Sequence, residues 1–461
     1  MLIDTHIHLE VSEYDADRDE IVQRAIENDV RCMITVGTNL PTSRQAGELA
    51  HRYPSVYAAV GIHPHEAMSA TEEVYRSLKE LACQEKVVAW GEVGLDYYRG
   101  FAPKKVQQEV LRRQVQLAQE SKLPLIIHDR EAHEDVLQIL QEEKAEEVGG
   151  VFHCFSGGES FAGRCIEILG FSLSFAGPVT FLNSEKLQRA AKKVPCQRLL
   201  IETDSPFLAP HPFRGHRNEP AHLKLVAEKI AELKGLTVED IARITTLNSH
   251  QLFGLGEEEA KGKLVYPIRD SLYLNLTNRC TNRCTFCVRT TTDYVKGHHL
   301  GLQKEPTVEE IWSALKAIGS PEAYKEVVFC GLGEPLLRLN EVVEIARRLK
   351  ARGAITRINT NGQANLIYGR NILPDLSGLM DAVSVSLNAE KAAKYHQLCR
   401  SQFGEGAYEA VKEFIREAHR YIPQVSMTVV GMPNTINVEA CRRIARELGV
   451  GFRVRDYNVV G

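Results

Sequence analysis

The chain has 461 residues, so at least two domains of ordinary size are expected. With 44% hydrophobic and 25% charged residues, its composition is that of an ordinary soluble globular protein. No apolar run approaches the ~20 residues of a membrane span and the chain opens on a strand-like segment instead of a targeting peptide, so we expect a cytoplasmic protein with reduced cysteines and no membrane partner.

The net charge of -4 hides an asymmetry between the two halves. Residues 1–257 hold 28 Lys and Arg against 38 Asp and Glu, a net charge of -10, whereas residues 258–461 hold 28 against 22, a net charge of +6. A basic surface over the whole chain, of the kind that drives non-specific DNA binding, is excluded. Any contact with nucleic acid is therefore expected to be local.

The first half alternates short apolar runs with helical patterns, which predicts parallel strands joined by helices. The predicted strands are Leu2–His8, Arg31–Gly37, Val56–His63, Val87–Gly94, Leu123–Asp129, Gly150–Phe155, Phe171–Gly177 and Arg198–Asp204. Eight such units form a (β/α)8 TIM barrel. Helical patterns such as Val106–Ser121 and Ala221–Lys234 would make its outer ring.

Metal-ligand side chains fall at the carboxyl ends of these strands, where barrels place their active sites. They are His6 and His8 on the first strand, Glu92 on the fourth, His128 on the fifth, His153 on the sixth and Asp204 on the eighth. A lone histidine is more often a core residue, but six ligands at one rim predict a metal site. Imidazole and carboxylate together suit zinc, manganese, magnesium or similar ions, and a central glutamate can bridge two of them about 4 Å apart, which is the chemistry of hydrolysis.

Five motifs give this half its family resemblance: His6-Ile7-His8, residues 61–65 (GIHPH), residues 91–99 (GEVGLDYYR), residues 153–157 (HCFSG) and residues 202–206 (ETDSP). Over about residues 1–256 the chain resembles the TatD family of metal-dependent deoxyribonucleases. The resemblance implies one metal held by His6, His8, Glu92 and Asp204, and a second held by Glu92, His128 and His153. Asp204 and Glu92 would be the catalytic carboxylates, with Asp204 placed to orient or deprotonate the attacking water.

Weaker candidates for substrate binding surround this site. His63 and His65 follow the third strand and could hydrogen-bond a phosphate, although His65 could equally cap the next segment. Arg99, Arg214 and Arg217 fall in rim loops where a guanidinium could clamp an anion or could simply be a solvated surface charge. The expected substrates are DNA ends or small nucleotides, with a metabolite phosphoester or an amide bond as the alternative.

The domain boundary is predicted from composition. Residues 254–263 are rich in Gly and Glu and lack apolar periodicity, which is typical of a solvated connector. We expect a hydrolase domain over residues 1–256, a linker over 257–263 and a second domain over 264–461.

The second domain is organised around Cys280, Cys284 and Cys287, whose C-x3-C-x2-C spacing brings three thiolates to one point. A [4Fe-4S] cluster normally takes four cysteines, so three leave one iron open. Zinc is disfavoured because no fourth ligand lies nearby, and a disulfide is disfavoured in a chain without a secretory leader. The loop resembles the signature of radical S-adenosylmethionine (SAM) enzymes, which implies that SAM binds the open iron and is cleaved to a 5'-deoxyadenosyl radical.

The rest of this half fits a (β/α)6 partial barrel. Its predicted strands are Ser271–Thr277, Glu326–Cys330, Ile355–Thr360, Ala382–Leu387, Gln424–Val430 and Phe452–Asp456, and its predicted helices are Val308–Ile318, Glu341–Arg352, Ala407–Tyr421 and Val438–Leu448. By type and position, the residues expected to bind SAM are Gly331, Gly333, Glu334, Asn359, Asn361, Ser384, Ser386 and Asn388. An ordinary strand-to-helix turn is the alternative for the glycine segment.

The remaining eight cysteines, such as Cys32, Cys83 and Cys165, fall in strand or helix patterns and are predicted to be core residues. No second cysteine cluster follows the first one, so an auxiliary iron-sulfur site is not expected. The expected partners of this half are an electron donor such as flavodoxin or ferredoxin and a radical substrate that the sequence does not name. The alternative is an activase that forms a radical on a partner protein.

Overall fold

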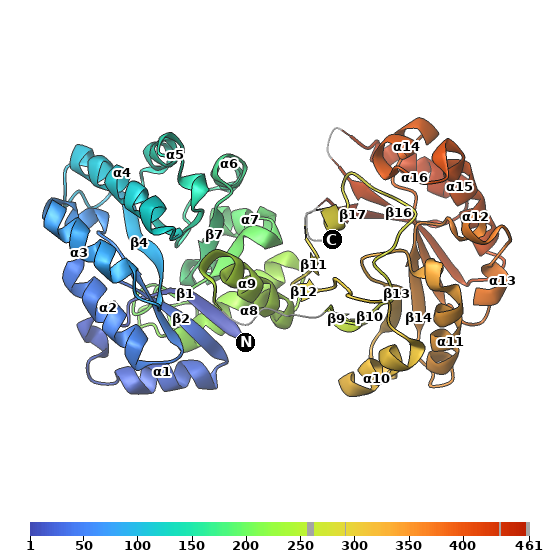
Figure 1. The fold of residues 1–461 in the computed structure, drawn as a ribbon, viewed down its shortest axis with the longest axis horizontal. Helices are drawn as coiled ribbons and strands as arrows, with labels where there is room; N and C mark the ends of the chain where they lie inside the picture. Colours follow the sequence, from blue (N-terminus) through green and yellow to red (C-terminus); the bar gives the residue numbers. More distant parts are fainter. Residues whose placement is uncertain (256–261, 291, 433–434, 458–461) are drawn as a thin grey trace. The chain divides into compact units, whose positions relative to one another are not determined.

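The computed structural model of the protein describes residues 1–255, 262–290, 292–432 and 435–457. It divides into two compact units, Met1–Glu258 and Glu259–Gly461 (Figure 1). Most of the predicted linker, residues 257–263, lies outside the described residues.

The first unit is the expected parallel barrel. Its strands follow one another around the sheet in chain order: β1 (Leu2–Ile7), β2 (Val30–Val36), β3 (Val56–Val60), β4 (Val87–Asp96), β5 (Leu125–Arg130), β6 (Gly150–Phe152), β7 (Ser172–Phe175) and β8 (Leu199–Ile201). The helices are α1 (Arg18–Glu27), α2 (Leu40–Arg52), α3 (Glu72–Ala82), α4 (Lys104–Ser121), α5 (His133–Glu142), α6 (Glu159–Leu169), α7 (Glu185–Lys193), α8 (Leu223–Lys234) and α9 (Val238–Phe253). The (β/α)8 prediction is confirmed.

The barrel closes just beyond the ends of β1 and β8. Ile7 forms a parallel bridge with Ser205, and the amide of His8 donates a 2.8 Å hydrogen bond to the carbonyl of Ser205. Inside the barrel, buried side chains from the strands pack together with Phe253 and Leu255, which end and follow α9. The interior is therefore filled with apolar side chains, and the polar residues gather where the strands end.

The second unit contains a seven-stranded sheet in the order β17-β16-β15-β14-β13-β10-β9. Six strands are parallel, as predicted: β10 (Ser271–Asn275), β13 (Glu326–Cys330), β14 (Thr356–Thr360), β15 (Ala382–Ser386), β16 (Gln424–Gly431) and β17 (Gly451–Asp456). The sequence did not indicate β9 (Val265–Ile268), which pairs antiparallel with β10, or the small hairpin of β11 (Tyr294–Val295) and β12 (His298–His299).

Helices connect the parallel strands of this unit. They are α10 (Val308–Ile318), α11 (Leu339–Lys350), α12 (Ala364–Tyr368), α13 (Leu373–Leu376), α14 (Ala392–Cys399), α15 (Ala407–Ala418) and α16 (Val438–Glu447). Strand residues alternate between two environments: Val383 and Val385 of β15 are buried in the core with the helices, whereas Ser384 and Ser386 between them are half-buried. The sheet thus has an apolar face toward the helices and a polar face on the other side.

Among the described residues, no helix is both long enough and apolar enough to cross a bilayer.

The prediction that Cys83 is a core residue is wrong. Cys165 is buried, but Cys83 caps the carboxyl end of α3 and is exposed, because the end of a helix turns away from its apolar stripe.

Candidate metal centre and cysteine loop

Four predicted ligands that lie far apart in the sequence of the first unit come together at one point. The Nε2 atoms of His6 and His8 face each other at 3.3 Å. Oε2 of Glu92 lies 3.5 Å from Nε2 of His6, and Oδ1 of Asp204 lies 3.5 Å from Nε2 of His8. The two remaining cross distances, from His8 to Glu92 and from His6 to Asp204, are both 3.8 Å.

This spacing suits a cation between the four atoms. Four ligands placed tetrahedrally about 2.1 Å from a zinc-like ion are roughly 3.4 Å apart. Two imidazole nitrogens that point at each other also need something between them or a proton on one of them, because both carry lone pairs in the neutral form. The donor set therefore fits a divalent metal.

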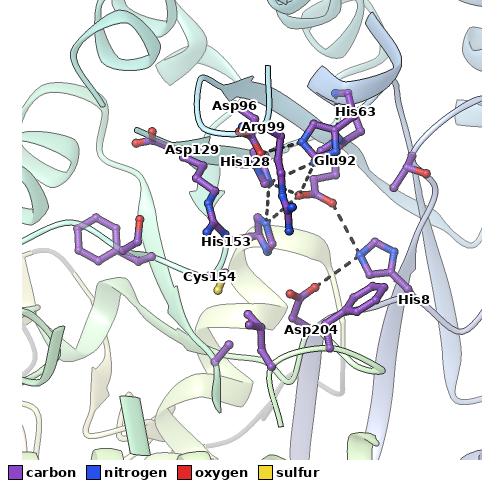
Figure 2. Close-up of a pocket in the computed structure, with 18 of the residues that line it drawn as sticks. His8, His63, Glu92, Asp96, Arg99, His128, Asp129, His153, Cys154 and Asp204 are labelled. Carbon is purple, nitrogen blue, oxygen red and sulfur yellow. Dashed lines mark hydrogen bonds and ion pairs between the residues drawn. The ribbon is translucent and has the colours of Figure 1, made fainter. Parts of the chain in front are cut away.

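The other carboxylate oxygen of Glu92 faces a second group of imidazoles (Figure 2). Oε1 lies 2.6 Å from Nδ1 of His128, 2.8 Å from Nε2 of His153 and 3.5 Å from Nε2 of His63. Nε2 of His63 is in turn 3.3 Å from Nδ1 of His128. His63, expected only as a substrate contact, thus joins Glu92 and His128 in a group that could hold an ion.

The ligands His6 and Asp204 are positioned at the seam of the barrel, where the chain after β8 meets β1. The amide of Asp204 donates a 2.9 Å hydrogen bond to the carbonyl of His6, which puts the two side chains next to each other. Behind them, Asp4 accepts hydrogen bonds from the amide of Thr203 at 2.9 Å and from its hydroxyl at 2.6 Å. Asp204 adopts a left-handed backbone conformation with φ +54°, so the chain turns sharply as it leaves the barrel.

Several ligand positions differ from the predicted strand ends. His8, His63, His153 and Asp204 lie beyond the hydrogen-bonded strands, which stop one to three residues earlier than predicted. Glu92, predicted near the end of its strand, lies inside β4, which continues to Asp96 past a register shift between Trp90 and Val93. Such an irregularity redirects side chains within a strand.

Three carboxylates that are not predicted ligands pair with the imidazoles and hold them in place. Oε1 of Glu10 lies 3.1 Å from Nδ1 of His8, and Oε1 of Glu202 lies 3.4 Å from Nδ1 of His153. Oδ2 of Asp96 lies 2.8 Å from Nε2 of His65. Sequence reasoning assigned these three acids no role, although Asp96 and Glu202 lie within the quoted motifs and Glu10 follows His8 by two residues.

The electrostatics of the site reflect these pairings. Burial opposes ionisation of Glu92, but His153, His63 and His128 outweigh it and hold its pKa well below the usual range. Burial likewise opposes protonation of His153, yet Glu92 and Glu202 raise the pKa of His153 well above its usual value. These buried carboxylates thus favour positive charge beside them, which is the chemistry expected of a cation site.

The converging residues form the floor of a cavity of about 950 Å³. Its rim carries the cationic side chains Arg99, Arg130 and Lys186, so an anion can be met at the mouth. His63 and His65 also line it. The cavity can therefore hold a small anionic group directly over the metal-binding side chains.

The two other candidate arginines have different surroundings. Nη1 of Arg217 lies 2.9 Å from Oδ1 of Asp17 and donates a 2.6 Å hydrogen bond to the carbonyl of Glu13. Arg214 stacks over the ring of Phe181 at 4.6 Å. Neither arginine is among the residues that line the cavity.

In the second unit, each of the three signature thiols has a hydrogen-bond donor nearby. Nε of Arg289 lies 3.3 Å from Sγ of Cys287, and the amide of Asn282 lies 3.4 Å from Sγ of Cys280. The thiol of Cys399 donates to Cys284 and lowers the pKa of Cys284. Donors aimed at sulfur favour the thiolate, which is the form that ligates an iron-sulfur cluster. At Cys280 burial outweighs the donor and raises the pKa of the thiol to about 11.

The glycine segment after β13 packs tightly against the start of the cysteine loop. A Cβ on Gly333 would meet the carbonyl oxygens of Thr277 and Arg279 at 2.4 and 2.3 Å, and Gly331 has φ +105°. The carboxylate of Glu334 is buried, where it accepts a 2.7 Å hydrogen bond from the amide of Asn361. These residues join β13 to the cysteine loop and to β14.

The other residues expected to bind SAM lie on or just beyond β14 and β15. Nδ2 of Asn359 lies 3.5 Å from Sγ of Cys330, and Nδ2 of Asn361 lies 2.8 Å from the hydroxyl of Thr281 and 3.7 Å from Sγ of Cys280. Ser384 and Ser386 hydrogen-bond to Ser426 and Thr428 of β16 at 3.1 and 3.2 Å, and Asn388 accepts a hydrogen bond from the amide of Val430. Among these five residues, Asn361 is the one that contacts the cysteine loop, and the serines contact β16.

Comparison with known proteins agrees with this geometry. The family model for TatD related DNases matches residues 3–254, more than half of the chain. The chain belongs to the TatD family. The uncharacterized metal-dependent hydrolase YabD of Bacillus subtilis is 52% identical over 253 residues, which cover 55% of this chain and 99% of YabD.

Two further TatD relatives extend the comparison. The 3'-5' ssDNA/RNA exonuclease TatD of Shigella flexneri is 35% identical over 262 residues, covering 55% of this chain and 99% of that protein. The crystal structure of YJJV, a TatD homologue from Escherichia coli, is 30% identical with a TM-score of 0.53 and covers 55% of this chain and 98% of its own.

The second unit contains a radical SAM domain, since the model of the radical SAM superfamily matches residues 274–445. The protein is therefore a TatD-type metal-dependent hydrolase fused to a radical SAM domain. Divalent metal ions in the TatD domain, and an iron-sulfur cluster with SAM in the other, are the cofactors that these domains imply.

Proposed function

We propose that the TatD domain hydrolyses phosphodiester bonds in single-stranded DNA ends or small nucleotides. The observation that carries the proposal is the orientation of Glu92, whose two oxygens face separate groups of imidazoles. A carboxylate arranged in this way suits two ions, and paired divalent ions stabilise the charge that develops in phosphoryl displacement and supply hydroxide near neutral pH. The Shigella relative that bears an exonuclease name supports the choice of bond.

The side chains of the TatD domain have the following proposed roles. His6, His8, Glu92 and Asp204 hold one ion, while Glu92, His128 and His153 hold the other with His63 beside them. Asp204 also orients the attacking water and accepts its proton, because its carboxylate lies at the cavity floor. Arg99 and Arg130 at the rim bind flanking phosphates, and the net charge of -10 of this half limits the footprint to a few nucleotides.

We propose further that the second domain holds a [4Fe-4S] cluster through Cys280, Cys284 and Cys287. A cluster held there would supply the single electron, drawn from a donor such as flavodoxin or ferredoxin, for the reductive cleavage of SAM to methionine and a 5'-deoxyadenosyl radical. The chain's own contribution is to place hydrogen-bond donors beside the thiols: Arg289 beside Cys287, the amide of Asn282 beside Cys280 and the thiol of Cys399 beside Cys284. Asn359, Asn361 and Ser386 are the side chains proposed to contact SAM.

The hydrolase assignment is tested with the full-length protein and manganese, magnesium or zinc on oligonucleotides, dinucleotides, N-acyl amino acids and lactones. Turnover of the phosphodiesters that is lost in Asp204→Asn supports the assignment. Turnover confined to amides or lactones would overturn it and leave the metal site in place.

The radical assignment is tested by anaerobic reconstitution with iron and sulfide. We expect about four iron atoms and four sulfides per chain and reductant-dependent formation of 5'-deoxyadenosine. Replacing Cys280, Cys284 and Cys287 together by Ala should remove the cluster and leave hydrolysis unchanged. A full cluster in that triple variant would disprove the assignment.

A further inference from the structure

The exposed aromatic side chains of the first unit gather in two loops at one end of the barrel. Among residues 1–255, the exposed Phe, Tyr and Trp side chains are Tyr98, Phe101, Phe207 and Phe213. The first two follow the carboxyl end of β4 and the other two follow that of β8, the ends at which Glu92 and Asp204 lie. Single exposed aromatics are common, but their confinement to the loops after two strands indicates a surface that contacts a ligand.

Phe207 is held beside the metal-binding side chains. It lines the cavity, and its ring centroid lies 5.8 Å from that of His8 in an edge-on arrangement. Its amide donates a 2.9 Å hydrogen bond to the carbonyl of Asp204, and its carbonyl accepts a 2.7 Å hydrogen bond from the side-chain amide of Asn218. The backbone is thus fixed at both polar groups while the ring is 48% exposed, so a preorganised apolar surface faces the cavity.

The loop after β4 presents two more rings, which lie against other residues that line the cavity. The guanidinium groups of Arg130 and Arg99 lie over the ring of Tyr98, 4.5 and 5.8 Å from its centroid. The ring centroid of Phe101 lies 4.8 Å from that of His65. Tyr98 is 55% exposed and Phe101 is 66% exposed. Aromatic rings and cations are therefore interleaved at the mouth of the cavity.

The rings lie beside both parts of the candidate metal centre. Phe207 contacts His8, whereas Phe101 contacts His65, whose ring centroid lies 6.2 Å from that of His128. Figure 2 shows His8 and His128 in separate positions on the cavity floor. In the proposed reaction the phosphate that is attacked lies over the two ions. A strand bound there has an aromatic ring near it in each direction.

We infer that Phe207 on one side of the attacked phosphate, and Tyr98 with Phe101 on the other, bind the bases of a single-stranded nucleic acid by stacking. Proteins that hold single strands combine cations, which meet the phosphates, with aromatic rings, which meet the flat faces of the bases. Every base has such a face, so the site accepts any sequence. Bases paired in a duplex are stacked on each other and do not reach the rings.

This inference rests on the proposed phosphodiester hydrolysis for the place of the phosphate, so binding and turnover are measured separately. Binding to full-length protein with manganese is followed by calorimetry in an Asp204→Asn background, which stops turnover. The probes are the tetranucleotides of dT and of rU, an abasic chain with the same sugars and phosphates as the dT probe, and a blunt-ended duplex. Turnover of the same probes is measured without Asp204→Asn. If no phosphodiester is hydrolysed, the proposed function fails, and the affinities still decide the inference.

The variants separate stacking from apolar contact and from folding. Phe207→Tyr keeps the ring, Phe207→Leu keeps apolar volume without a flat face, and Phe207→Ala removes both. Tyr98→Ala and Phe101→Ala test the other loop. The matched control is Ile168→Ala, a large apolar side chain exposed on α6. Bound manganese and the thermal unfolding midpoint establish that each variant is folded, and if Phe207→Ala is not, Phe207→Leu and Phe207→Tyr provide the comparison.

We expect Phe207→Ala and Phe207→Leu to lose roughly fivefold or more in affinity for the dT and rU probes, and Phe207→Tyr and Ile168→Ala to lose nothing. Tyr98→Ala and Phe101→Ala should also weaken these probes. The abasic chain should bind more weakly than dT and equally to every variant, and KM for dT should rise in the same variants. A preference between dT and rU identifies DNA or RNA as the substrate. Equal affinity for dT and the abasic chain, tighter binding of the duplex, or unchanged affinities in Phe207→Leu, Tyr98→Ala and Phe101→Ala would overturn the inference.

Discussion

The amide of Asp204 donates a hydrogen bond of 2.9 Å to the carbonyl of His6, at the seam where the last strand of the barrel meets the first. Nearly the whole TatD domain lies between these two residues in the sequence. Their side chains come together only when the barrel closes, so the metal site and the closed barrel depend on each other.

Divalent metal should therefore stabilise the TatD domain. At a hundredfold excess over its dissociation constant, an ion that binds only the folded state adds about 2.7 kcal/mol to the free energy of unfolding. The chain has two tryptophans, and Trp90 is buried in the barrel, so its fluorescence in a Trp312→Phe background reports this domain alone. His6→Ala should abolish the shift between manganese and a chelator, and His51→Ala, exposed on α2, should keep it.

The position of Glu92 between two imidazole groups bears on the number of metal ions that each chain binds. Glu92→Gln should lower both bound equivalents, because each oxygen faces a separate group, whereas His153→Ala should remove mainly one. Metal analysis after dialysis measures both. Glu131→Gln, an exposed carboxylate on the cavity rim, is the control. Two full equivalents in Glu92→Gln would contradict a shared carboxylate.

Asp96 should affect the metal through other residues. Its Oδ2 lies 2.8 Å from Nε2 of His65 and 3.3 Å from Nε2 of His128, while Oδ1 accepts a 2.8 Å hydrogen bond from the amide of Arg99. Asp96→Asn keeps the shape but removes the charge that orients His128, so we expect roughly a 10- to 100-fold loss in metal affinity. Competition with a chromogenic chelator measures the loss. A variant as tight as the parent would show that Asp96 only supports the loop.

Sequence patterns predicted the regular elements well where the elements are long and amphipathic. α10 and β13 have the predicted bounds, since a capping box at Thr307 starts the helix and the strand formers Val327, Val328 and Phe329 make the strand. The strands β9, β11 and β12 escaped prediction because they are short and lie outside the alternation of strand and helix patterns, which revealed equally short strands such as β6 and β8.

The candidate site was predictable in its converging residues but not in what surrounds them. Metal-ligand types at strand ends are visible in sequence, whereas the pairing of Glu202 with His153 depends on folding that brings distant segments together. Arg217 illustrates the same limit: it pairs with Asp17, two hundred residues away, and a rim loop alone does not reveal that partner.

The last prediction concerns Glu334 and the pH dependence of the radical SAM domain. Its carboxyl group is 2% exposed, and burial raises its pKa to about 7 from a usual value of 4.5, although Asn361, Thr360 and Leu336 donate hydrogen bonds to it. A pKa raised by folding means that the folded state binds the proton more tightly than the unfolded state. The associated stability is complete below about pH 4.5 and is lost as the pH rises through about 7.

The cluster-free protein should therefore lose about 3 kcal/mol of unfolding free energy in this domain between pH 4.5 and pH 8. Trp312 lies on α10, so denaturant titrations of a Trp90→Phe variant follow the domain by its fluorescence. Glu334→Gln should flatten the pH profile, because the amide is neutral throughout and can still accept a hydrogen bond from Thr360. Glu405→Gln, exposed in the 3-10 helix Gly404–Gly406, should leave the profile unchanged. Equal slopes with and without Glu334 would show that another group carries the pH dependence.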